Sequence, residues 1–69
     1  MESAINHTVL RHRVETEYSE MPGLKLTVWQ AGRLWNVSSD VCEAVLVSLV
    51  QTGFLHRTGD GQFLRPSST

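Results

Sequence analysis

The chain has 69 residues, of which 41% are hydrophobic and 19% charged, and its formal net charge is −1. A chain of this length forms one domain and buries only about 60% of the surface that its unfolded state exposes, so dimerisation would add stability. Cys42 is the single cysteine, which excludes an intrachain disulfide, and no apolar run approaches the roughly 20 residues that span a bilayer. The first residues lack the basic and apolar regions of a secretion signal. We therefore expect one domain, residues 1–69, in the cytoplasm and without a membrane segment.

Residues 3–20 contain no glycine or proline, and their apolar side chains recur at close to helical spacing. Pro22 disfavours the helical conformation just before it, and Gly23 permits a left-handed turn. Residues 1–23 are therefore predicted to form an N-terminal helix and turn. This helix either packs across the rest of the domain or forms a dimer contact. The candidates for that contact are Leu10, Val14 and Tyr18.

Residues 24–26 alternate apolar and polar side chains, which is enough for a short strand. Thr27 and Gln30 have the spacing of a capping box, so a second helix is predicted over residues 28–35. Trp29 lies away from the apolar face of that helix. It either packs under the first helix or belongs to an exposed patch, and we favour packing.

A sharp turn and a third helix are predicted next. Asn36 adopts the left-handed conformation at low cost, and Ser38 or Ser39 is suited to cap the following helix. Gly53 ends that helix. Its apolar side chains are spaced i, i+3, i+4, i+7 and i+8, as on a core-facing stripe. They are Cys42, Val45, Leu46, Leu49 and Val50.

Two short apolar segments lie on either side of an Asp-Gly turn at residues 59–61. This pattern predicts a β-hairpin that runs from residue 54 to residue 65. Residues 66–69 are expected to be a frayed tail.

The order of these elements, over residues 24–65, resembles the small winged-helix domains of prokaryotic transcription regulators, such as the MarR-like and related groups. The resemblance rests on small residues where two helices approach, apolar residues around the turn and on the third helix, and the glycines of the hairpin tip. It implies an α+β, mainly α fold: a winged helix-turn-helix with three helices and a C-terminal β-hairpin wing. The residues that carry it are Ala31, Gly32, Trp35, Asn36, Val37, Cys42 and Val45, with residues 49–55 and 59–61.

The resemblance further implies a small regulator that binds double-stranded DNA, with the third helix in the major groove and the wing against the phosphates. Residues 24–69 carry four basic against three acidic side chains, whereas residues 1–23 carry two against four. The exposed face of the third helix lacks the Arg, Lys, Asn and Gln side chains that commonly read bases. The candidate DNA contacts are Lys25, Arg33, Ser39, Glu43, His56, Arg57 and Arg65.

The alternative is a winged-helix module that binds another protein. The face of the third helix expected to meet solvent combines two acidic with two apolar side chains, which suits a protein partner better than a phosphate backbone. Those residues are Asp40, Glu43, Ala44 and Val47.

Catalysis, metal binding and cofactors are not expected. No histidine has a nucleophile near it in sequence, and His7, His12 and His56 lack the spacing of metal ligands. Cys42 is either a redox sensor whose thiol pKa is lowered near a helix N-terminus or a small buried hydrophobe. Its position on the apolar stripe favours the second role.

Overall fold

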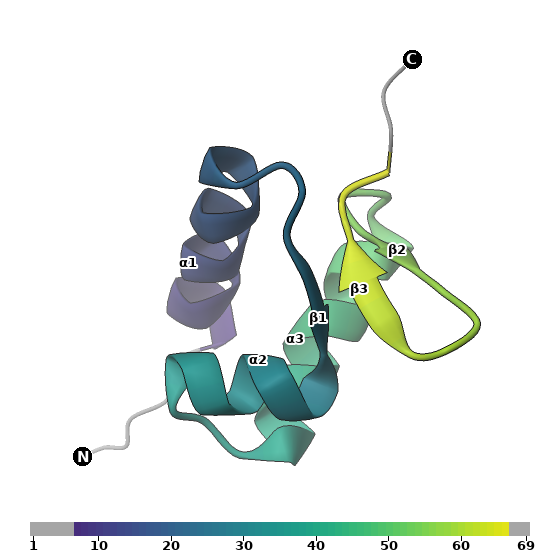
Figure 1. Cartoon of the computed structure of the whole chain (residues 1–69). Coiled ribbons are helices and arrows are strands. Elements are labelled where there is room, and N and C mark those ends of the chain that lie inside the picture. The colour runs from purple at the N-terminus through teal and green to yellow at the C-terminus, as the bar shows by residue number, and fades with distance from the viewer. Residues whose placement is uncertain (1–6, 67–69) are drawn as a thin grey trace.

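The computed structural model describes residues 7–66 and has an α+β, mainly helical architecture (Figure 1). Residues 3–6 of the expected first helix and residues 67–69 of the expected tail lie outside the described residues. Within residues 7–66, no helix has both the length and the apolar character needed to cross a bilayer. The elements are α1 (His7–Glu20), β1 (Lys25–Thr27), α2 (Val28–Trp35), α3 (Ser39–Gln51), β2 (His56–Arg57) and β3 (Gln62–Leu64).

The start of α2 is held by the predicted capping box. The backbone N–H of Gln30 donates to the Thr27 hydroxyl over 3.1 Å, and the backbone N–H of Thr27 donates to Oε1 of Gln30 over 3.0 Å. At the start of α3 the cap is Ser38, whose hydroxyl accepts the backbone N–H of Val41 at 3.3 Å. Each cap pairs a backbone donor that the first turn of a helix leaves without a partner. The capping predictions are confirmed, and Ser38 is the cap of α3.

The turn between α2 and α3 is compact. Asn36 has the predicted left-handed conformation, with φ of 57° and ψ of 49°, and the backbone N–H of Val37 donates to the Gly32 carbonyl over 3.0 Å. A Cβ added to Gly32 would lie 3.1 Å from the Val37 carbonyl oxygen. Gly32 therefore allows the close approach that lets α2 turn directly into α3.

The left-handed conformation of Asn36 gives a testable stability difference. Asn36→Ala should lower the free energy of unfolding by about 1 kcal/mol, because a Cβ without a polar group is disfavoured in this conformation. Asn36→Gly should leave it nearly unchanged, since glycine adopts this conformation without steric cost. Urea unfolding of the two variants measures the difference, and equal losses would contradict this explanation.

The three strands form one antiparallel sheet in the order β1-β3-β2. The hairpin was predicted, but the pairing of β1 with β3 was not, and β2 begins later than expected. The backbone N–H of Leu55 donates to the Leu49 carbonyl over 3.1 Å, which ties that residue to the end of α3. In Figure 1 β1 lies between α1 and the hairpin, which projects away from the helices.

The core closes around α1, α3 and the buried side of the sheet. The hydroxyl of Tyr18 donates to the Phe63 carbonyl over 2.7 Å, which joins α1 to β3. Leu10, Val14 and Tyr18 are 8%, 1% and 0% exposed. They therefore pack inside their own chain, and the interpretation of these side chains as a dimer contact is wrong. The buried core residues are Leu10, Val14, Tyr18, Ala31, Trp35, Cys42, Val45, Leu46, Leu49, Leu55 and Phe63.

Burial and, to a lesser extent, the nearby Cys42 thiol raise the pKa of Tyr18 to about 12, against an ordinary value of 10.0. The folded chain thus binds the phenolic proton more tightly than the unfolded chain does. The contribution of Tyr18 to stability is fully present below pH 10.0 and is lost as the pH rises through about 12.

Tyr18→Phe should lower the free energy of unfolding by about 1 kcal/mol at neutral pH, because it removes a buried hydrogen bond to the Phe63 carbonyl. Exposed Ser19→Ala on the same helix is the control and should have little effect. Because Tyr18 is the only tyrosine, the absorbance of its phenolate also reports its pKa directly. Ionisation near pH 10.0, or a Tyr18→Phe protein as stable as the wild type, would contradict the buried hydrogen bond.

Candidate nucleic-acid interface

The exposed face of α3 carries acidic side chains and small side chains. Ser39, Asp40, Glu43 and Ala44 are exposed over its first half, whereas Val47 is half-buried. Glu43 can accept a hydrogen bond from cytosine N4, and Ser39 can contact a base or a phosphate. The carboxylates of Asp40 and Glu43, however, repel a phosphate backbone. The apolar part of this face is smaller than expected, because Val47 lies at the edge of the core.

Two of the candidate DNA contacts lie on the outer side of the sheet. Lys25 and His56 are the partners of Leu64 on either side of β3. Directly opposed residues of antiparallel strands place their side chains on the same face. Both side chains are exposed. The sheet therefore brings together two residues that are 31 positions apart in the sequence.

Arg57 and Arg65 are both stacked on phenylalanine rings, in different surroundings. The Arg57 guanidinium carbon lies 5.7 Å from the centre of the Phe63 ring, and the side chain remains exposed at the edge of β2. The guanidinium carbon of Arg65 lies 4.0 Å from the centre of the Phe54 ring, and its Nη1 donates to the Phe54 carbonyl over 3.3 Å. Arg57 is thus available to a ligand, whereas the half-buried Arg65 fastens the two ends of the hairpin together.

The outer face of α2, formed by Trp29, Arg33 and Leu34, is the main exposed apolar feature of the helices. Trp29 is 65% and Leu34 53% exposed, so the expectation that Trp29 packs under the first helix is wrong. The guanidinium carbon of Arg33 lies 5.0 Å from the centre of the indole. With Leu26 and Gln30 these residues line a shallow hollow of about 380 Å³.

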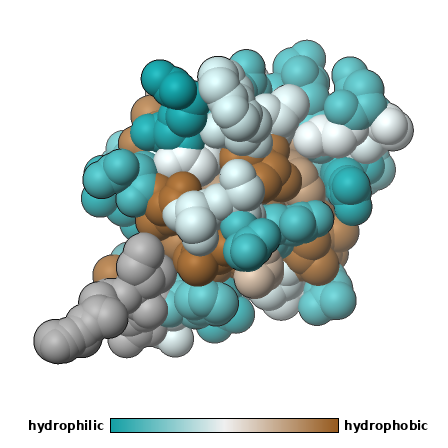
Figure 2. Space-filling view, turned by 90° about the horizontal axis from the view of Figure 1, so that it is seen from below, coloured by the Kyte–Doolittle hydropathy of each residue, from teal (hydrophilic) through white to brown (hydrophobic). Residues whose placement is uncertain are grey.

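The direction of α2 explains why Trp29 points outward. Ala31 and Trp35, on the opposite side of the helix, fill the core, and α1 covers α3 rather than this face. Figure 2 views the molecule from below, where α2 and the α2–α3 turn lie in Figure 1, and shows apolar surface exposed between polar side chains. A tryptophan with this exposure is typical of an interaction surface.

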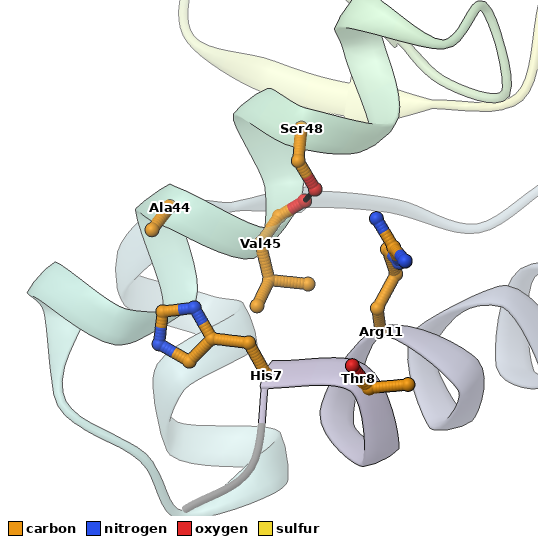
Figure 3. Close-up of a pocket in the computed structure, with 6 residues that line it drawn as sticks. All are labelled: His7, Thr8, Arg11, Ala44, Val45 and Ser48. Atoms are coloured by element: carbon orange, nitrogen blue, oxygen red, sulfur yellow. Dashed lines mark hydrogen bonds between the residues drawn. The ribbon is translucent and has the colours of Figure 1, made fainter.

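A notch between the start of α1 and the middle of α3 was not predicted (Figure 3). It has a volume of about 150 Å³, and none of the described residues that line it carries a carboxylate. His7 and Arg11 project toward α3 from successive turns of α1, a spacing visible in the sequence. Which side of α1 faces α3 depends on packing, however, so the sequence does not reveal the notch. Its lining residues are His7, Thr8, Arg11, Ala44, Val45 and Ser48.

The environment of Cys42 does not favour redox sensing. Its side chain is 1% exposed in the core, and burial raises the pKa of the thiol. A raised pKa reduces the fraction of thiolate, which is the reactive form. The alternative of a thiol pKa lowered by the α3 N-terminus is therefore wrong, and Cys42 packs as a small hydrophobe.

Comparison of the chain with protein-family models, curated proteins and solved structures gives no match. Functional inference therefore depends on the arrangement of these surfaces.

Proposed function

We propose that the chain is a winged helix-turn-helix module, of the kind found in small prokaryotic transcription regulators, and that it binds double-stranded DNA. The observation that carries the proposal is the sequence of elements: a tight α2–turn–α3 unit followed by a hairpin whose β3 also pairs with β1. In winged-helix proteins α3 enters the major groove and the hairpin forms the wing. The argument is an analogy at the level of the fold.

The side chains suggest how such a module would bind. Lys25, on the outer side of the sheet with His56, and Arg57, at the edge of β2 on the opposite side, supply positive charge to the sheet and hairpin. Asp40 and Glu43 make α3 unfavourable to phosphate. Affinity would then come from backbone contacts around α3, and sequence reading by α3 would be weak. With so few cations, binding would be modest and confined to low salt.

The proposal predicts that the protein binds mixed-sequence duplex DNA at about 50 mM salt and releases it near 200 mM. Arg57→Ala should weaken binding and reduce the slope of log affinity against log salt by about 0.9, the contribution of one phosphate contact. Fluorescence anisotropy with labelled duplexes measures both quantities.

Arg65→Ala is the matched comparison, because it removes the same charge from a side chain that packs on Phe54. It should lower the free energy of unfolding by about 1–2 kcal/mol and leave the salt slope of the folded protein unchanged. Absence of DNA binding at about 50 mM salt, or an Arg57→Ala protein indistinguishable from the wild type, would overturn the proposal.

A second candidate function is binding to a protein partner, and the exposure of Trp29 is the observation that favours it. Buried Trp side chains often dominate the energy of protein interfaces. The outer face of α2 presents this indole beside Leu34 and a single cation, Arg33. The acidic α3 residues Asp40 and Glu43 are a further surface that suits a protein better than DNA.

Trp29→Ser tests this candidate. Because the indole is exposed, the free energy of unfolding should change by no more than about 0.5 kcal/mol. A partner retained from an extract of the source organism by the wild type should be lost. Val9→Ser, at an equally exposed position on α1, is the control and should keep that partner. Equal retention by all three proteins would exclude the outer face of α2 as the binding surface.

A further inference from the structure

The notch between α1 and α3 has the chemistry of an anion site. His7 and Arg11 lie one helical turn apart on α1, and Figure 3 shows both directed toward α3. Neither side chain has an ion-pair partner among residues 7–66. Arg presents a planar fork of N–H donors that matches the oxygens of a phosphate. Both nitrogen-bearing side chains therefore line a hollow in which no carboxylate from residues 7–66 takes part.

The α3 side of the notch leaves room for a ligand. Ala44 contributes only a methyl group, and the Ser48 hydroxyl donates its hydrogen to the Val45 carbonyl over 2.7 Å. The charge for an anion must therefore come from α1. Farther along the same groove, a second hollow includes Glu15 beside Arg11, which makes that hollow unfavourable to an anion. The anion site is thus confined to the start of α1.

We propose that His7 and Arg11 bind a phosphate group in this notch. If the phosphate is part of DNA, this inference rests on the proposed function, and it adds the start of α1 to the DNA-binding surface formed by α3. A contact there would supply positive charge beside a helix whose own exposed charges are Asp40 and Glu43. Free inorganic phosphate offers the same chemistry, so the experiment has an arm for each source.

The first arm measures affinity for a mixed-sequence duplex at low salt. Arg11→Ala should weaken binding about tenfold, as expected for loss of one charge-assisted hydrogen bond. It should also reduce the salt slope by about 0.9. Arg13→Ala is the matched control, because Arg13 is exposed on the same helix and lines neither hollow.

The second arm adds inorganic phosphate, against chloride at equal ionic strength, and follows the backbone amides by NMR. Saturable shifts at His7, Arg11, Ala44 and Ser48 are expected in the wild type and in Arg13→Ala. They should be absent in Arg11→Ala, whose amide spectrum also shows whether the variant is folded.

The outcomes separate the notch from the proposed function. Loss of DNA affinity in Arg11→Ala alone supports both. Phosphate shifts without DNA binding support the notch as a site for a free anion and overturn the DNA proposal. DNA binding that Arg11→Ala and Arg13→Ala weaken equally, without phosphate shifts at the notch, overturns the notch and leaves DNA binding standing. The absence of both DNA binding and phosphate shifts overturns both.

Discussion

The hydrogen bond from Tyr18 to the Phe63 carbonyl is the contact on which the remaining arrangement depends. It connects α1 with β3 through two residues that are 45 positions apart, inside a small core. A small domain gains little stability from burial alone, so a buried bond between the two ends of the fold carries considerable weight. The contact ties α1 to the sheet, and the side chains of both residues are buried in the core.

Two candidate surfaces follow from this constraint. Because Phe63 is buried, the next residue of β3, Leu64, lies on the outer side of the sheet with its neighbours Lys25 and His56. Because α1 is fixed across α3, His7 and Arg11 come to lie beside the exposed part of that helix. Basic side chains are therefore placed on the outer side of the sheet and at the start of α1 rather than on α3 itself. Such an arrangement favours contacts that position a duplex over contacts that read its sequence.

The features that local chemistry determines were predictable from the sequence. The capping box at Thr27, the left-handed Asn36 and the apolar stripe of α3 each depend on residues within two helical turns. The sequence also indicated that Leu10, Val14 and Tyr18 are buried. An apolar stripe on one helix, however, is compatible both with packing into the core of its own chain and with packing against a second chain. Only the packing of α1 on α3 distinguishes the two.

The features that depend on contacts between distant segments were not predictable. The pairing of β1 with β3 and the notch both join residues that are far apart in the chain. Trp29 was misplaced for a related reason. Periodicity shows that it lies off the apolar face of α2, but not whether another element covers that side. The outward face of α2 is left uncovered because α1 packs on α3 instead.

The central claim is that duplex DNA binds around α3, between the sheet on one side and the start of α1 on the other. The most direct test follows the backbone amides by NMR while a mixed-sequence duplex is added at low salt. We expect shifts in the first half of α3, at Lys25 and His56, and at His7 and Arg11, with little change at Trp29 and Leu34. Shifts confined to the outer face of α2, or no shifts at all, would contradict the claim.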